Sequence, residues 1–462
     1  MLTPEKLKLL QAFLGNLPPP MAQRLARAVE WDRLNDGNLF PHDLIMESLR
    51  PALRQASRPD RMPSPQRLFC EPFEDLLSAS PRQEKHKGRI ARASVPPVWD
   101  WLSESLIPDE TRTYVRAVTS AVLHYDVYGA RGYAREFWDT ASKAMREALC
   151  HEASREAARL ALQDNLAVAD AVEMALLLSA SAFVAQIQEK LPRAAPTLSE
   201  DLIWELREIY DSLVETLPDA APYVAVIAMN RLAKPWEALK LPLMIARKTQ
   251  DTMISSTDMG LAGDLLLLDI ADHAHAICAV HPPAFDVDEL LRHLGRFTEL
   301  SSAIVKEVEI RRDGRWGQHL FRDRALVGEA MGEMMKLVPR EILAVLPMHR
   351  SGAYGSGPRV PVTARPLEPE KIERAIRYAK LLVGCRHLAA AASFQAACQN
   401  AFDDVLGALA AFNDGIEHEI RSTSEEVRIR AEPFHAVAVE LTAILFSRQE
   451  AEHMRRRAAI AA

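Results

Sequence analysis

The chain contains few cysteines, and those it has do not form a recognisable set. Its five cysteines, in 462 residues, are an odd number and include no CxxC pair. Disulfide-stapled domains and thiolate zinc sites depend on paired cysteines, so neither is expected to organise this fold. The scattered cysteines, which fit a reducing compartment, are Cys70, Cys150, Cys278, Cys385 and Cys398.

Long uncharged apolar segments are also missing. The most apolar stretch, residues 171–187, contains Glu173 and has about 17 residues, fewer than the roughly 20 that a membrane-spanning helix needs. A second apolar stretch, residues 261–280, carries aspartate and histidine side chains that are costly in hydrocarbon. The N-terminus never develops the apolar run of a secretory signal. We expect no membrane span and a location in a bacterial-type cytoplasm.

Short catalytic and nucleotide-binding motifs are absent too. The chain has no GxGxxG, GxxxxGK(S/T), HExxH or GxSxG pattern, which are the main signatures of nucleotide-binding sites, zinc peptidases and hydrolases. This lowers the odds of an enzyme without excluding one, because catalytic groups can converge from distant positions. No cofactor is indicated.

An excess of positive charge is likewise missing. The net charge is -7 and the isoelectric point is near 6.1. A domain that binds nucleic acid through its whole surface is usually basic. The charge balance therefore argues against nucleic acid as a partner.

What the sequence does have is a helical composition and pattern. Hydrophobic residues make up 48% of the chain and aromatic residues only 6%, and abundant alanine, leucine, arginine and glutamate lose little side-chain entropy in helices. Residues 109–191 contain no proline, and their apolar side chains recur at helical spacing. The sequence predicts an all-α protein, either a multi-helical bundle or a short α-solenoid.

Several helix ends can be placed from capping residues. Pro4 suits a first helical turn and Gly15 suits the following stop. Thr197 and Glu200 form a candidate capping box ahead of an apolar helix face. Pro369 again suits a first turn.

Proline and glycine divide the chain into four predicted regions. Residues 1–107 form a loop-rich N-terminal region with short helices, and residues 108–346 form the main helical domain. Residues 347–368 are a Gly/Pro loop or linker, and residues 369–462 are a C-terminal helical region. The prolines that interrupt the first region are Pro18, Pro19, Pro20, Pro41, Pro51, Pro59, Pro63, Pro65, Pro72, Pro81, Pro96 and Pro97.

Helical spacing fails most clearly at residues 307–319. Asp313 and Gly314 lie there between short alternating flanks, a pattern typical of a tight turn. The segment is either a small hairpin or a helix-loop-helix joint.

Basic residues in and after this turn form the strongest candidate site. Guanidinium groups beside a helix N-terminus can hold phosphate or carboxylate groups, and the loop with Tyr354 and Arg359 could close over them. The sequence nevertheless favours a solvated turn whose arginines pair with nearby acidic helices over anion binding. The anion-binding candidates are Arg311, Arg312, Arg315, Trp316, His319 and Arg322, with Gln318 and Arg324 beside them.

Metal-binding patterns are loose. Asp269 and His273 are one helical turn apart and could offer two ligands to one ion, but the favoured interpretation is a partly exposed helix with intrahelical Asp–His pairs. ExxH spacings at residues 432–435 and 450–453 are similar to those of di-iron carboxylate bundles, yet lie near the charged C-terminal tail. Neither pattern suffices to assign a metal.

A second basic segment, residues 82–92, precedes the proline-free region. Apart from His86 it carries Arg82, Lys85, Lys87, Arg89 and Arg92. It lacks the interleaved aromatic residues of a single-strand binding surface. We interpret it as a basic connector that could contact an acidic partner.

Two functional hypotheses follow. The favoured one is a non-catalytic helical scaffold or adaptor that binds other proteins through extended helical surfaces. The alternative is an enzyme or sensor that recognises an anionic or phosphorylated ligand through the arginines at 311–324. The expected partners are accordingly another protein or a small anionic ligand.

Overall fold

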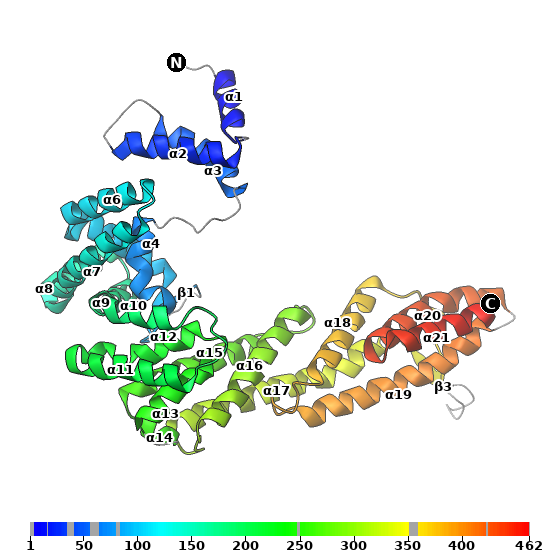
Figure 1. Cartoon of the computed structure of the whole chain (residues 1–462). Coiled ribbons are helices and arrows are strands. Elements are labelled where there is room, and N and C mark those ends of the chain that lie inside the picture. Colours follow the sequence, from blue (N-terminus) through cyan, green and yellow to red (C-terminus); the bar gives the residue numbers. More distant parts are fainter. Residues whose placement is uncertain are drawn as a thin grey trace. The chain divides into compact units, whose positions relative to one another are not determined.

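The structure, a computed structural model, describes residues 4–15, 17–34, 41–55, 64–79, 84–246, 250–350, 359–421 and 424–461. The protein is all-α, as predicted, with two very small sheets among these residues (Figure 1). The chain divides into two compact units, Met1–Leu241 and Pro242–Ala462. The division into four regions stays a prediction.

Unit 1 consists of helices and short 3-10 or π turns, with one pair of short parallel strands. Its elements are α1 (Pro4–Gly15), α2 (Pro19–Leu34), α3 (His42–Gln55), α4 (Pro65–Cys70), η1 (Glu71–Leu76), β1 (Leu77–Ser78), β2 (Ile90–Ala91), η2 (Arg92–Ser94), α5 (Val95–Trp101), η3 (Leu102–Leu106), α6 (Pro108–Leu123), α7 (Val127–Cys150), α8 (Glu152–Leu162), α9 (Asn165–Ser179), α10 (Ser181–Lys190), α11 (Glu200–Thr216), η4 (Pro218–Ala220), α12 (Tyr223–Arg231) and η5 (Pro235–Leu239). Helix α13 (Lys240–Ala246) crosses the boundary between the units.

An aromatic cluster forms the part of the unit 1 core beneath α4. The rings of Tyr114 and Phe137 stack with centroids 4.1 Å apart, and Phe69 packs edge-on against Phe73. Trp99 of α5 contacts the same group. Because these rings come from α4, η1, α5, α6 and α7, their burial holds α4 and η1 against α7.

Several described prolines of the N-terminal region lie in the first turn of a helix. Helix α1 runs from Pro4 to Gly15 as predicted, and α2 begins at Pro19. A proline in the first turn loses no hydrogen bond, because that amide has no helical partner. The first three helices share a small apolar cluster that includes Val29 and Leu49.

Helix boundaries in the proline-free region depend on short polar caps. Asp126 accepts a hydrogen bond from the amide of Gly129 at the start of α7, and Asp164 does the same for Leu166 at the start of α9. The predicted capping box at Thr197 is wrong: Ser199 is the N-cap of α11, because its hydroxyl accepts from the amide of Leu202.

Unit 2 is built from longer helices. Its elements are α14 (Asp251–Ile254), η6 (Asp258–Gly260), α15 (Leu261–Cys278), α16 (Val287–Glu307), α17 (Arg315–Leu343), β3 (Met348–Arg350), β4 (Arg359–Pro361), α18 (Pro369–Cys385), α19 (Gln395–Ile420), α20 (Glu425–Leu445) and α21 (Arg448–Ala461). Helix α15 packs on α16 and α17, and α19 packs on α17 and α20. Pro369 begins α18, as predicted.

Residues 307–319 form the helix-loop-helix joint rather than the hairpin. Helix α16 ends at Glu307 and α17 begins at Arg315, and between them Glu309 forms an isolated parallel bridge with Gln250. A hairpin occurs instead in the Gly/Pro region, where β3 and β4 pair antiparallel with Arg350 opposite Arg359. Helix propagation on both sides of the Asp313-Gly314 turn leaves too few extended residues there for a ladder.

Candidate functional site

A cavity of about 550 Å³ lies in unit 1 among α4, η1, α7, α10 and the end of α12. Its lining combines arginine and glutamate side chains with a smaller apolar part that includes Trp138 and Val184. The charged residues that line it are Arg67, Glu71, Glu74, Arg131, Arg135, Glu189, Arg193 and Arg231.

The innermost cation, Arg231, is fixed by four hydrogen bonds. Its Nη1 donates to both carboxylate oxygens of Asp75, at 3.1 and 3.0 Å, and both side chains are at least nine-tenths buried. Its Nε donates to the carbonyl of Leu191 and its Nη2 to that of Gln188. A buried ion pair whose remaining donors are satisfied keeps one geometry, so Arg231 forms a rigid end of the cavity.

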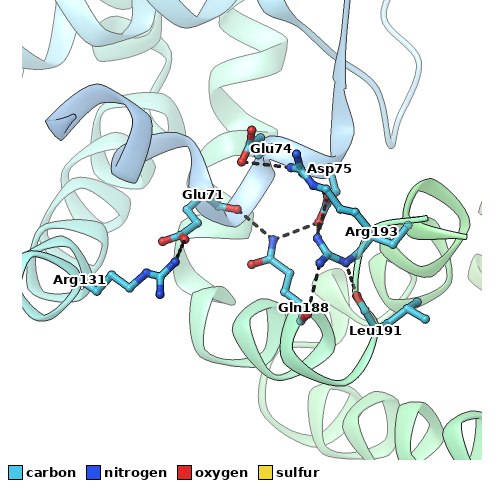
Figure 2. Close-up of polar contacts among 8 residues, drawn as sticks. Glu71, Glu74, Asp75, Arg131, Gln188, Leu191 and Arg193 are labelled. Atoms are coloured by element: carbon cyan, nitrogen blue, oxygen red, sulfur yellow. Dashed lines mark hydrogen bonds and ion pairs between the residues drawn. The ribbon is translucent and has the colours of Figure 1, made fainter. Parts of the chain in front are cut away.

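Gln188 connects the two sides of the cavity. Its Nε2 donates to the backbone carbonyl of Glu71 at 3.1 Å and to Oδ2 of Asp75 at 3.0 Å. Figure 2 shows the Gln188 side chain between these two acceptors, with the ribbon of η1 on one side and α10 on the other. The amide thus fixes η1 on α10, because it satisfies acceptors from both ends of one short turn.

Two further arginines pair with glutamates nearer the cavity mouth. Arg131 contacts Glu71 at 3.0 Å and Arg193 contacts Glu74 at 3.1 Å (Figure 2). Both arginine side chains are more than half exposed. Pairs this exposed contribute about 0–1 kcal/mol, so an anion that enters the cavity can compete for these arginines.

Two arginines of the lining have no ion pair within the described residues. Arg67 lies on α4 and Arg135 on α7, one turn after Arg131, and both are exposed. The indole of Trp138 holds their two helices together by donating to the carbonyl of Leu68 at 3.1 Å. Arg231 is already paired with Asp75, so the four other arginines stand against three glutamates, and the lining keeps an excess of one positive charge.

The Cys70 thiol beside the cavity is in its protonated, unreactive form near neutral pH. Burial, with Glu74 nearby, raises the pKa of Cys70 to about 12. A thiol with that pKa is protonated near neutral pH, and the thiolate is the reactive form. Cys70 therefore supplies no covalent step at this position.

The residues predicted as an anion site lie in unit 2, around the start of α17. Arg311 pairs with Asp313 at 3.0 Å, and Arg322 is 3.3 Å from Asp323. Arg315 contacts Asp264 at 2.7 Å. These carboxylates compensate the three guanidinium groups locally.

The other three predicted residues have different surroundings. Trp316 is buried and donates Nε1 to Asp264 at 2.6 Å, so the structure brings it together with Arg315 on one carboxylate. Arg312 lies over the ring of Phe321 at 5.2 Å, and His319 is exposed. Arg359 lies on β4, whereas Tyr354 of the proposed lid lies outside the described residues.

The weak metal candidates do not gather into a ligand set. Asp269 and His273 lie on α15, and Nδ1 of His273 is 2.9 Å from Nδ1 of His293 on α16. Within the described residues, no group of three or more histidine, cysteine or acidic side chains could hold a metal ion. In the ExxH pattern at 432–435, His435 is buried on α20.

Sequence reasoning did not identify the arginine cavity. Its cations are distributed over residues 67–231 and belong to three helices, α4, α7 and α12, and to the loop that follows α10. The only local signal was the spacing of Arg131 and Arg135 along one helix face, which is common on exposed helices.

Comparison with protein-family models, with curated proteins and with solved structures finds no match to this chain. Among the described residues, no helix taken alone has the length and apolar character to span a membrane. Helices α9 and α10 pass that test only as a pair, with a bend of 74° between them.

Proposed function

We propose that this protein works by binding and that the cavity in unit 1 recognises an anionic group, either a carboxylate or a phosphate. The observation that carries the proposal is the presence of Arg67 and Arg135 without ion pairs in a cavity that already contains three other arginines. Uncompensated guanidinium groups in a concave site are the usual means of binding carboxylates and phosphates.

The fixed part of the cavity supports this proposal. Arg231 and Gln188 are held by several hydrogen bonds within the protein, so this end of the cavity needs little reorganisation when a ligand enters. The Cys70 thiol beside the cavity, with its raised pKa, is protonated near neutral pH and adds no negative charge that would oppose an anion.

Titration with inorganic pyrophosphate and with citrate tests the proposal, because each probe carries several of the anionic groups in question. Calorimetric titration of the wild-type protein should detect binding of at least one of them, and a saturating concentration should raise the melting temperature. The double variant Arg67→Gln/Arg135→Gln should weaken that binding at least tenfold.

The matched control is Arg155→Gln, which removes an exposed arginine of α8 outside the cavity. It should bind the probes as the wild type does. Equal affinities in the wild type, the double variant and the control would show that the cavity is not the binding site.

A scaffold that binds another protein is the second candidate function. Three tyrosines around the start of α7 favour it: Tyr125, Tyr128 and Tyr133 are 58%, 89% and 45% exposed. Tyrosine is enriched in protein interfaces because its ring buries a large area at a low entropic cost.

A comparison of variants tests the scaffold function. Tyr128→Ser/Tyr133→Ser should abolish recovery of a reproducible protein partner from a cell lysate, whereas Trp204→Ser, which removes another exposed aromatic residue from α11, should retain it. Recovery that is the same for both variants would contradict this function for the tyrosines.

A further inference from the structure

The basic segment that precedes η2 does not extend into solvent as a simple connector. Lys85 turns inward, and its ammonium group contacts Asp170 and Glu173 on α9 and donates to the carbonyl of Arg89 at 2.6 Å. Gly88 adopts a φ of 84°, and its amide donates to Glu173 at 2.6 Å. The segment therefore closes a tight turn against the buried carboxylates of α9.

The hydrogen bonds of these two carboxylates are satisfied within the protein. Besides the contacts with Lys85, Oε1 of Glu173 accepts from the hydroxyl of Tyr223, and Oδ2 of Asp170 accepts from the amide of Ala91 and the hydroxyl of Ser94. All three hydrogens of the Lys85 ammonium group are likewise used. This network forms a rigid wall whose donors are all used within the protein.

A second cavity of about 550 Å³ lies against this wall. It shares no lining residue with the arginine cavity described above. One helix face supplies its apolar part through Ala169, Val172 and Leu176. Val172 is 45% exposed, which is unusual for an aliphatic residue on an otherwise buried helix. Apolar surface in a concavity of this size, with a few polar groups around it, is typical of small-molecule sites.

Three charged groups of this lining have no ion pair or hydrogen bond within the described residues. Lys87 and Arg146 are cationic and exposed, and the ammonium group of Lys87 lies 5.8 Å from the centre of the Tyr223 ring. Asp219 is the carboxylate among them. Lys87 and Arg146 are therefore the two cations of this lining that a ligand carboxylate can contact.

We propose that this cavity is a second ligand site, for an amphipathic carboxylate with one acidic group and an apolar body. The apolar body covers the α9 face at Val172, and the carboxylate lies between Lys87 and Arg146. Asp219 and the net negative charge of the Lys85–Asp170–Glu173 network disfavour ligands with several acidic groups, because both repel negative charge. The ring of Tyr223 offers its apolar face, since its hydroxyl is engaged by Glu173.

The site is independent of the arginine cavity and of the function proposed for it. The two cavities share no lining residue, and they select opposite ligands. The arginine cavity, with its larger excess of cations, suits compact anions of high charge, whereas this cavity suits a singly charged ligand with apolar surface.

Calorimetric titration of the full chain with decanoate, below its micelle concentration, tests the inference. Decanol supplies the same tail without the charge, and acetate supplies the charge without the tail. Decanoate should bind at one site, and decanol and acetate should each bind at least tenfold more weakly. Decanoate that binds no more tightly than decanol would overturn the role of the two cations.

Variants locate the binding. Val172→Asp should weaken decanoate binding at least tenfold, because a carboxylate would replace the exposed apolar surface. Lys87→Gln/Arg146→Gln should also weaken decanoate binding at least tenfold, but should leave decanol binding unchanged. The matched controls are Val214→Asp, on α11 with the same 45% exposure, and Lys143→Gln, an exposed cation of α7 outside the cavity.

Far-ultraviolet circular dichroism confirms that each variant is folded. Decanoate affinities that agree for Val172→Asp and Val214→Asp would overturn the site. Pyrophosphate serves as an internal comparison. The Val172→Asp variant should bind pyrophosphate as the wild type does, so a change in decanoate binding alone can be assigned to the second cavity.

Discussion

Two buried carboxylates in unit 1 determine which nearby lysine turns inward and which is exposed. Asp170 and Glu173 are 2% and 5% exposed, and each is compensated by donors from the segment that contains Lys85 and Gly88. A carboxylate this deeply buried is tolerated only when its oxygens accept hydrogen bonds. The same contacts that stabilise α9 therefore turn Lys85 away from solvent and leave Lys87 at the cavity.

A histidine pair shows the opposite situation in unit 2, where neighbouring groups disfavour charge. Burial lowers the pKa of His273 to about 4, with further lowering by His293 and Arg296 and an opposing effect of Asp272. Burial and the neighbouring Arg292 also lower the pKa of His293, against the effect of Glu289. With Nδ1 atoms 2.9 Å apart, one imidazole donates and the other accepts, so at least one ring must be neutral.

This pair predicts a loss of stability in mild acid. Between pH 6.5 and about 4, the unfolded chain takes up a proton at His273 that the folded protein does not. The free energy of unfolding therefore decreases as the pH is lowered from 6.5 to about 4. Because the ring is partly exposed, we expect a loss of roughly 1 kcal/mol rather than the full value of the shift. Urea unfolding at a series of pH values measures it.

His273→Gln should remove this component of the pH dependence. His319→Gln, which changes an exposed histidine on α17, should retain it. A His273→Gln variant whose stability falls between pH 6.5 and 4 as steeply as that of the wild type would contradict the assignment.

At the scale of elements, close helix packing in unit 2 depends on glycine. A Cβ atom added at Gly263 of α15 would lie 2.2 Å from Cη2 of Trp316, which is 1% exposed on α17. The two helices therefore approach across a position where no side chain fits. The tryptophan predicted from the sequence as part of a binding site is, in the structure, a packing residue whose indole is held by Asp264.

Gly263→Ala should destabilise the protein by about 1–3 kcal/mol, because the methyl group forces the Trp316 ring out of its place. Gly332 of α17 is the matched control: among the described residues, an added Cβ there would meet no atom within 4 Å. Gly332→Ala should be neutral or stabilise the protein by up to about 1 kcal/mol, because alanine favours the helix. Urea unfolding compares the two, and equal stabilities would contradict the packing argument.

At the scale of the whole molecule, the division into two units has a thermodynamic consequence. Each unit buries its own apolar residues, from Phe69 and Leu178 in unit 1 to Phe297 and Phe412 in unit 2. Units with separate cores often unfold in separate steps, and a single two-state transition is then a poor description.

Scanning calorimetry should accordingly resolve two unfolding transitions. Lys85→Ala leaves Asp170 and Glu173 buried without their cation and should lower the melting temperature of the unit 1 transition. Gly263→Ala should lower the melting temperature of the unit 2 transition. One transition that both variants shift together would show instead that the chain unfolds as a single cooperative body.

The helical class and several helix ends were predictable, whereas lengths in the N-terminal region were not. Pro4, Gly15 and Pro369 mark helix ends as expected, because a first-turn proline and a terminal glycine act through their own backbone. Prolines were expected to keep the early helices short, yet α2 continues for 16 residues from Pro19. A proline at a helix start and a proline in a loop are indistinguishable by composition.

The sequence by itself determined that this chain is helical, because helix formation follows local spacing and nearby caps. Only the tertiary structure decided which charges are compensated. Arg315 meets Asp264 on another helix, while Arg67 and Arg135 share a cavity with Arg231. The physical reason is that pairing of these charges depends on which helix faces meet in space, because residues many helical turns apart in the sequence meet only through packing.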